Sequence, residues 1–314
     1  MFHEHKVFVT VPAFDEQERI ESTLTGVPDF VDRIVVVDDG SSDSTGERVE
    51  RRRNQDPRIV LLRHQRKAGV GAATLTGFRW SAENGADVVV KMDGDGQMNP
   101  THLPELLEPL VAGQVDYVKG NRFLDASELQ SMPKLRLLGN FFLTFLTKLA
   151  SGYWSVFDPQ NGFVALRTET LDRLPLDGLA NGYFFENDML VRLNVASCRV
   201  RDVRIPARYT GEKSKMSLWR VAVTFPLLLA HRFWYRIYQK YVLRDFSPIA
   251  LFYGLGIPLL VWGFFFGLAV WVHSIVYSQV ATVGTVMLSA LPVIVGLQLV
   301  LQAIVLEIQE SKVS

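Results

Sequence analysis

The segment VVVKMDGDGQ carries the residues best suited to chemistry in this sequence. Asp93 and Asp95 stand two residues apart after an apolar run, and glycines at positions 94 and 96 accompany them. Glycine lets the backbone turn sharply, so both carboxylates can approach one hard cation, which keeps positions open for substrate phosphates. The pattern predicts Mg²⁺ or Mn²⁺ on Asp93 and Asp95, stabilising charge on a departing diphosphate. An ordinary turn rich in Asp and Gly is the alternative.

A second acidic turn, VVVDDGSSDST, ends another apolar run. Asp38 and Asp39 follow that run, and the serines and aspartate after them are residues that cap helix N-termini. A carboxylate in this position can accept a hydrogen bond from a nucleobase edge or a ribose hydroxyl, and turn and cap chemistry alone is the alternative. A third segment, GVGAATLTGF, follows Arg66 and Lys67 and resembles an anion site at a helix start. It lacks both the dinucleotide fingerprint and the P-loop pattern.

Short β-branched runs alternate with segments of helical content over the first 120 residues. The expected strands are Lys6–Pro12, Arg33–Asp39, Arg58–Leu62, Asp87–Asp93 and Asp116–Gly120, and the expected helices are Asp15–Thr25, Asp43–Arg53 and Gly71–Glu83. This alternation predicts an α/β fold with a mostly parallel sheet covered on both faces. Ligands bind such sheets at the carboxyl ends of strands, where Asp15/Glu16 and the two other acidic pairs fall. The sequence therefore predicts a single site there.

The overall composition narrows the class of protein. Lys and Arg number 33 and Asp and Glu also number 33, so the chain is formally neutral, which argues against a nucleic-acid binder. The single cysteine, Cys198, cannot form an intramolecular disulfide, and the first residues, MFHEHKVFVTVP, lack the zones of a signal peptide. We expect the bulk of the chain to face a reducing cytosol.

The C-terminal part of the chain has no Asp, Glu, Lys or Arg from Phe246 to Leu306. Because a bilayer crossing takes roughly 20 apolar helical residues, this stretch predicts a transmembrane hairpin with spans at about 249–272 and 282–306. The connection, 273–281, holds no Lys or Arg, whereas four basic residues precede the first span: Arg232, Arg236, Lys240 and Arg244. The positive-inside rule places both termini in the cytoplasm of a multi-pass cell-membrane protein. A buried hairpin in a soluble protein is the alternative.

The expected domain organisation follows from these patterns. Residues 1–213 form the catalytic domain, 214–247 form interfacial amphipathic helices rich in aromatic and basic residues, 248–308 form the hairpin and 309–314 form a cytoplasmic tail. An ordinary amphipathic helix on the soluble domain is the alternative for the interfacial part. Small residues in the first span, such as Gly254, could pack helix against helix, which leaves a homo-oligomer open.

Eight ordered segments between Val9 and Tyr209 together resemble a known family. They are VPAFDEQERI, VVVDDGSSDST, HQRKAGVGAATLTGF, VVVKMDGDGQMNP, GNRF, RLLGN, DPQNGFVALR and YFFENDML. The chain resembles the family 2 (GT-A fold) glycosyltransferases, in the branch of dolichol-phosphate mannose synthase and the polyprenyl-phosphate glycosyltransferases. The C-terminal hairpin is similar to that of the branch's membrane-anchored members. ENDML is not followed by a QxxRW segment, which argues against the processive synthases.

The resemblance implies a role for residues at matching positions. The residues implied to contact the nucleoside are Pro12, Phe14, Glu16 and Asp38, with Asp39 beside them, and those implied to bind the metal are Asp93, Asp95 and Gln97. Arg122 and Arg136 are implied to hold the acceptor phosphate. Asp158 is implied to lie near the sugar, and Glu186 and Asp188 near the acceptor. Arg208 and Lys215 are further candidates for the acceptor phosphate. Phe14, Asp15, Lys67 and Val70 depart from the family's usual Tyr, Asn, Asn and Lys.

The expected reaction moves one sugar from a UDP- or GDP-linked donor to polyprenyl phosphate, with inversion. A phosphate monoester is already anionic at neutral pH, so a catalytic base is optional, whereas a hydroxyl acceptor requires one. The main demands are stabilisation of the leaving diphosphate and orientation of two anions, and arginine serves the second through its planar fork. The alternatives are a transferase that uses a hydroxyl acceptor, with Asp158 as its base, and a non-catalytic sugar-nucleotide sensor.

Overall fold

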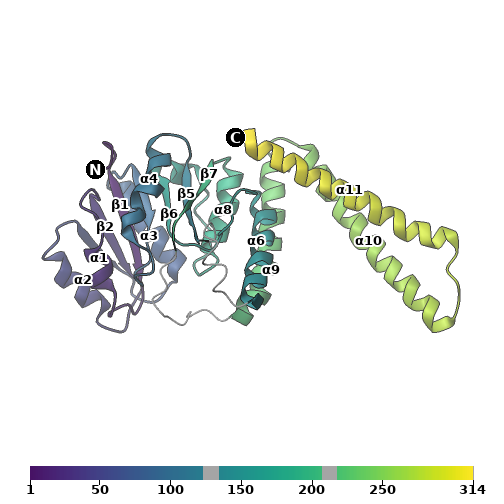
Figure 1. Ribbon diagram of the computed structural model, residues 1–314, viewed down its shortest axis with the longest axis horizontal. Coiled ribbons are helices and arrows are strands. Elements are labelled where there is room, and N and C mark those ends of the chain that lie inside the picture. The colour runs from purple at the N-terminus through teal and green to yellow at the C-terminus, as the bar shows by residue number, and fades with distance from the viewer. Residues whose placement is uncertain (123–133, 207–217, 314) are drawn as a thin grey trace. The chain divides into compact units, whose positions relative to one another are not determined.

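The computed structural model describes residues 1–122, 134–206 and 218–313, without the side chains of 134–138, 218–220 and 311–313. The described chain forms two compact units, Met1–Phe233 and Trp234–Ser314. In Figure 1 the first unit is an α/β domain and the second is a pair of long helices.

A seven-stranded sheet forms the centre of the first unit. Its strands are β1 (Val7–Ala13), β2 (Arg33–Asp38), β3 (Ile59–Arg63), β4 (Val88–Lys91), β5 (Tyr117–Asn121), β6 (Val164–Arg167) and β7 (Val200–Arg204). They lie in the order β3-β2-β1-β4-β6-β5-β7. Every neighbouring pair is parallel except the two pairs that β6 makes with β4 and β5. The expected α/β fold with a mostly parallel sheet is confirmed.

Helices of the first unit cover both faces of this sheet (Figure 1). On one face they are α1 (Ile20–Thr25), α2 (Thr45–Arg53) and α4 (Leu103–Val111), with a 3₁₀ turn η1 (Pro100–His102) before α4, and on the other face they are α3 (Val70–Glu83), α7 (Thr168–Arg173) and α8 (Phe185–Val195). The helix α6 (Lys134–Ser151) packs against α8, and α9 (Leu218–Arg236) ends in the second unit. Successive strand residues point to opposite faces, so Val9 packs in the core with α1 and α4, whereas Phe8 packs in the core with α3 and α8.

The first five strands start and end within two residues of the five expected ones, whereas β6 and β7 were not among the expected strands. The largest difference is at the first helix, which was expected from Asp15 but begins at Ile20. Asp15 has a φ of 52°, in the left-handed region that a helix cannot continue through. Residues 16–19 form a turn instead, and this turn places Glu16 at the end of β1.

The antiparallel strand β6 is decisive for the site. The carboxyl ends of β1, β2, β4, β5 and β7 meet at one edge of the sheet because these strands run in the same direction. β6 runs the other way, so its amino end reaches the same edge. The segment Asn161–Phe163, which leads into β6, therefore joins the turns that follow β4 and β5.

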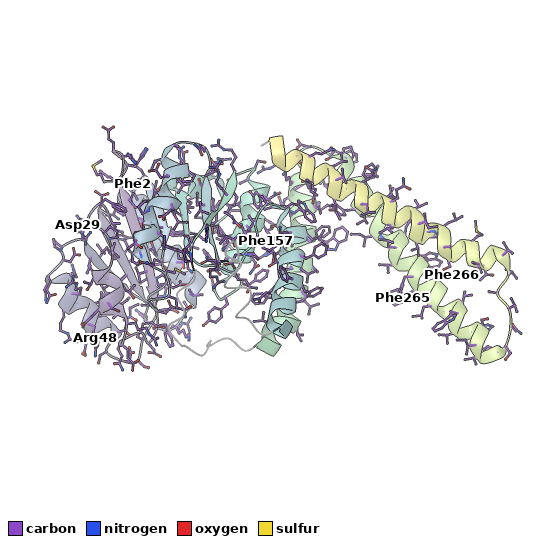
Figure 2. The ribbon with its side chains drawn as sticks, in the orientation of Figure 1. Phe2, Asp29, Arg48, Phe157, Phe265 and Phe266 are labelled. Atoms are coloured by element: carbon purple, nitrogen blue, oxygen red, sulfur yellow. The ribbon has the colours of Figure 1, made fainter. Side chains whose placement is uncertain are left out.

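The second unit contains a π-helix, η3 (Ile237–Val242), and the helices α10 (Pro248–Tyr277) and α11 (Val283–Val313). Both long helices are apolar enough to cross a bilayer, with a mean hydropathy of 2.1 and only 11% of that window buried. Side chains such as Phe265, which is 61% exposed, project from α10 (Figure 2). Large exposed apolar surface of this kind suits a lipid environment, so the two helices suggest membrane anchoring.

Glycines allow α10 and α11 to pack closely along the hairpin. A Cβ atom on Gly263 would lie 2.7 Å from a methyl group of Val293 and 2.8 Å from the backbone oxygen of Ser289. Gly256 and Gly296 approach each other in the same way. Small residues at such positions let backbones come together without a side chain between them. Within this chain, these glycines therefore serve the packing of one span against the other.

Candidate active site

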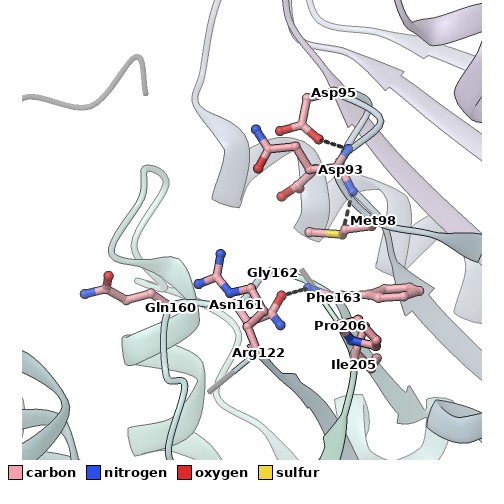
Figure 3. A pocket seen from close by; sticks show the side chains of 11 residues that line it. Asp93, Asp95, Met98, Arg122, Gln160, Asn161, Gly162, Phe163, Ile205 and Pro206 are labelled. Carbon is pink, nitrogen blue, oxygen red and sulfur yellow. Dashed lines mark hydrogen bonds between the residues drawn. The ribbon is translucent and has the colours of Figure 1, made fainter. Parts of the chain in front are cut away.

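A pocket lies at the edge of the sheet where the strand ends converge (Figure 3). It is lined by residues from four segments: the turn after β4, the end of β5, the approach to β6 and the residues after β7. Asp93, Asp95 and Gln97 come from the first of these, and Arg122 from the second. The structure thus brings together the predicted metal-binding residues and one predicted acceptor arginine.

Asp93 and Asp95 occupy the turn after β4, as the glycine pattern predicted. Gly96 has a φ of 73°, a conformation that side chains rarely adopt, so the turn depends on this glycine. The backbone N–H of Gln97 donates to Asp95 Oδ1 at 3.0 Å. Burial, followed by the negative charge of Asp93, raises the pKa of Asp95 to about 6.

The donor set at this turn fits a hard divalent cation. The negative charges of Asp93 and Asp95 repel each other, and a cation between the two carboxylates would relieve this repulsion. Among the residues that the structure describes, no group of three or more His, Cys, Asp or Glu side chains stands at metal-binding spacing. Asp93 and Asp95 would therefore hold the cation with oxygen ligands from a diphosphate and water, which is the usual arrangement for Mg²⁺ with phosphate substrates.

Arg122 and Asp158 form a bidentate ion pair at the pocket. Arg122 Nε donates to Asp158 Oδ2 at 2.7 Å, and its Nη2 donates to Oδ1 at 3.0 Å. The backbone N–H of Arg122 also donates to Oδ2. Asp158 is only 1% exposed, whereas the Arg122 side chain is 37% exposed. Two-point contact fixes the plane of the guanidinium, so Asp158 orients Arg122 toward the pocket.

The expected nucleoside-binding residues lie at the ends of β1 and β2. The backbone oxygen of Pro12 accepts a hydrogen bond from Gly94, which joins the β1 end to the metal-binding turn. Glu16 lies close enough for its charge to contribute, after burial and Asp93, to the raised pKa of Asp95. Asp38 Oδ1 accepts from the backbone of Ser41. Pro12, Phe14, Glu16 and Asp38 are not among the residues that line the pocket of Figure 3.

Two departures from the family pattern contact each other. The Lys67 ammonium lies 3.5 Å from the centre of the Phe14 ring, which is a cation–π contact. A tyrosine and an asparagine are the more usual residues at these positions. The pair therefore joins the loop after β1 to the loop before α3.

The structure does not bring Asp39 or Asp188 to the pocket. Asp39 is 2% exposed, and its carboxylate accepts hydrogen bonds from the backbones of Ala68 and Gly69 and contacts His64 Nδ1 at 2.7 Å. Asp188 is fully buried and accepts from Arg232 Nη2 at 2.8 Å and from the backbone of Ala180. Protein donors occupy both oxygens of Asp39 and Oδ2 of Asp188, so the two carboxylates hold neighbouring segments together.

Three predicted acceptor-side cations cannot be placed at the pocket. Arg208 and Lys215 lie outside the described residues, and Arg136 lies in α6 at a position whose side chain is not described. Glu186 lies in the first turn of α8, is 7% exposed and accepts a hydrogen bond from Lys91 Nζ at 2.9 Å. Arg122 is thus the predicted acceptor-phosphate residue whose side chain the described structure places at the pocket.

The structure adds residues that sequence reasoning missed. Lys91 is buried at the end of β4, and Asn161 and Gly162 line the pocket beside the turn. Lys119 in β5 is fully buried and donates to the backbone oxygen of Asn161, and burial lowers its pKa to about 8. The sequence signal for Lys91 was a lysine at the end of the otherwise apolar strand VVVK. A lysine is almost never buried without a partner, so this position could have indicated a buried ion pair.

The sequence is similar to those of known glycosyltransferases. The chain matches the family described as glycosyl transferase family 2 over residues 8–174. An undecaprenyl-phosphate mannosyltransferase of Micrococcus luteus is 34% identical and covers 68% of this chain and 88% of its own length. A polyprenol monophosphomannose synthase of Mycolicibacterium smegmatis is 31% identical and covers 68% of this chain and 81% of its own length.

Solved structures show the same fold. Glucosyl-3-phosphoglycerate synthase from Mycobacterium tuberculosis, in complex with Mn²⁺, uridine diphosphate and phosphoglyceric acid, has a TM-score of 0.56 and 22% sequence identity. The similarity covers 73% of this chain and 79% of that one. The same synthase has also been solved with Mg²⁺ and uridine diphosphate. The family match over more than half of the sequence, with relatives at these identities, shows that the chain belongs to glycosyl transferase family 2 and is a glycosyltransferase.

Proposed function

We propose that this protein transfers one sugar from a nucleoside diphosphate sugar to a polyprenyl phosphate, with inversion at the anomeric carbon. The observation that carries the proposal is the pocket that holds Asp93 and Asp95 on one wall and Arg122 on the other (Figure 3). One wall suits the cation that accompanies a diphosphate, and the other presents a guanidinium to a second phosphate. The names of the undecaprenyl-phosphate and polyprenol relatives support this acceptor class.

The reaction follows from these groups. An oxygen of the acceptor phosphate bonds to the anomeric carbon as the bond from that carbon to the diphosphate oxygen breaks, and the electron pair leaves with the nucleoside diphosphate. Asp93 and Asp95 would hold a divalent cation, which when bound would stabilise the negative charge that develops on the leaving diphosphate. Asp158 fixes the plane of Arg122, and Arg122 orients the acceptor phosphate for attack from the opposite side.

The pairing of Asp158 favours a phosphate over a hydroxyl as the acceptor. A hydroxyl nucleophile needs a base with a carboxylate oxygen within reach of its proton. Both oxygens of Asp158 accept hydrogen bonds from Arg122, and the side chain is 1% exposed. A phosphate monoester carries no proton that must be removed at neutral pH, so it can react without this base.

The direct assay uses the purified full chain in detergent with labelled UDP- and GDP-sugars, Mg²⁺ or Mn²⁺, and either polyprenyl phosphate or the corresponding polyprenol. We expect an anionic glycolipid from the phosphate alone. A product from the polyprenol would establish the hydroxyl alternative. Nucleotide binding without turnover across all donors would establish a sensor instead of an enzyme. The same donor panel determines the nucleotide and the sugar.

Arg122→Ala is the sharpest variant for the acceptor role. We expect the KM for polyprenyl phosphate to rise by about tenfold or more, because a charged hydrogen bond is worth roughly 1.5–3 kcal/mol, while the KM for the donor changes much less. Arg201→Ala is the matched control, since Arg201 is an exposed arginine of β7 that donates to Gln114. Equal changes in both KM values would contradict the assignment.

We further propose that the hairpin crosses the membrane and holds the catalytic unit at its cytoplasmic face. Arg236 Nη1, before α10, donates to Glu307 Oε1, near the end of α11, at 2.7 Å. The two ends of the hairpin are therefore joined, as they must be if both lie on one face. The basic residues before α10 favour the cytoplasmic face. A cysteine introduced within 273–281 should be labelled from outside intact cells, and protection there would overturn this orientation.

A further inference from the structure

A buried ammonium group links the metal-binding turn to α8. Lys91 is the last residue of β4 and is 1% exposed. Its Nζ lies 2.7 Å from Asp93 Oδ1 and 2.9 Å from Glu186 Oε1. A lysine at this depth is stable only if carboxylates compensate its charge. The compensating groups here come from two distant segments, one of which is the turn that would hold the cation.

The surrounding backbone keeps this lysine in place. Gly162 lines the pocket, and the absence of a side chain at this residue leaves room for the ammonium group of Lys91. A Cβ atom at this position would overlap Lys91 Nζ and lie 2.8 Å from Asp93 Oδ2. The peptide at Gly162 therefore packs directly against both charged groups. Lys91 and the carboxylate of Asp93 have little freedom to separate without displacing that peptide.

Because Asp93 and Glu186 share one ammonium group, the extent to which Lys91 compensates the charge of Asp93 depends on Glu186. One positive charge is divided between two carboxylates, so a loss of either leaves the other fully neutralised by Lys91. Among the described residues, those that line the pocket do not include Glu186. Its influence on a cation at Asp93 would therefore pass through Lys91 and not through direct coordination.

We propose that Lys91 is a positioning residue that couples Glu186 to the binding of the divalent cation at Asp93. This inference rests on the cation of the proposed function. Glu186 draws the ammonium partly away from Asp93 and so leaves this carboxylate negative enough to bind a metal ion. When Glu186 loses its charge, the ammonium group of Lys91 pairs with Asp93 alone. The carboxylate of Asp93 is then neutralised more fully and binds the metal ion more weakly.

The test measures binding of Mn²⁺ to the purified full chain in the presence of UDP or GDP, by the electron paramagnetic resonance signal of free Mn²⁺. Glu186→Gln should weaken Mn²⁺ binding by about five- to tenfold, within the range for directly coupled residues. In a Lys91→Met background the same substitution should change the affinity by less than about twofold. An equal effect of Glu186→Gln in both backgrounds would overturn the coupling through Lys91.

Two further variants keep the test decisive. Glu186→Asp retains the charge and should recover most of the Mn²⁺ affinity lost in Glu186→Gln. This variant tests the role of the Glu186 charge even if Lys91→Met fails to fold. Glu169→Gln removes the charge of a carboxylate that is 63% exposed and should leave Mn²⁺ binding unchanged. Wild-type affinity in Glu186→Gln overturns the coupling but leaves the metal site standing. Metal-independent turnover without Mn²⁺ binding by the wild type overturns both.

Discussion

Replacement of Arg236 by methionine should destabilise the hairpin far more than the same replacement at a neighbouring lysine. The Arg236 side chain is fully buried, and Glu307, which accepts its hydrogen bond, is 1% exposed. The hydroxyl of Tyr253 donates to the other oxygen of Glu307 at 3.3 Å. One turn further along, Lys240 Nζ lies 2.9 Å from Glu310, whose side chain is 40% exposed. The two pairs join the same segments and differ chiefly in burial.

The expected magnitudes follow from that difference. Removal of one partner of a buried ion pair leaves the other charge without compensation and costs about 3–5 kcal/mol. In the second pair Lys240 is 11% exposed and Glu310 is 40% exposed, so water can compensate the charge of Glu310, and the loss should lie nearer the roughly 0–1 kcal/mol of a surface pair. Methionine retains much of the apolar volume of either long side chain, so packing losses should be similar. Arg236→Met should therefore cost several times more stability than Lys240→Met.

The assay is unfolding of the full chain in mixed micelles by increasing fractions of SDS, followed by circular dichroism. Addition of Glu307→Gln to Arg236→Met removes the uncompensated charge and should restore most of the lost stability. Equal losses in Arg236→Met and Lys240→Met would refute the reasoning. So would a double variant that is no more stable than Arg236→Met alone.

Three other substitutions test the packing and electrostatics of the two units. Gly162→Ala should lower kcat/KM by about a hundredfold, because its methyl would displace the metal-binding turn, whereas Gly182→Ala, with open space around it, should be near wild type. Gly263→Ala should destabilise the hairpin by about 1–3 kcal/mol in the SDS assay, and Gly254→Ala, which also meets open space, should not. Burial raises the pKa of Asp202 from 3.8 to about 6, so the folded chain holds this proton more tightly than the unfolded chain and stability falls as pH rises from about 4 to 6. Asp202→Asn should flatten that fall in a profile of melting temperature against pH, and an unchanged slope would contradict it.

The sheet could be predicted from sequence because its signals are local. The β-branched run of β1, VFVTVPA, is buried throughout, as expected for a parallel strand covered on both faces. The strand β6 escaped prediction because its four residues, VALR, carry no periodicity long enough to recognise. Its antiparallel direction depends on its pairing with β4 and β5, which no local pattern encodes.

The candidate site was predictable in part. Asp93 and Asp95 were expected at a strand end, and they line the pocket there. Asp39 and Asp188 had the same kind of sequence signal, an acidic residue beside another in a turn or helix start. Their carboxylates are enclosed by protein donors, and burial of a single side chain is not visible in the sequence.

The sequence by itself determined most elements of this protein, its acidic strand ends and its two long apolar helices, because these depend on residues close together along the chain. Only the tertiary structure decided which charges meet. Asp158 binds Arg122 across 36 positions, and Glu186 meets Lys91 across 95. Such pairs form where strands from distant parts of the chain share one edge of the sheet, and their strength depends on the burial that this packing creates.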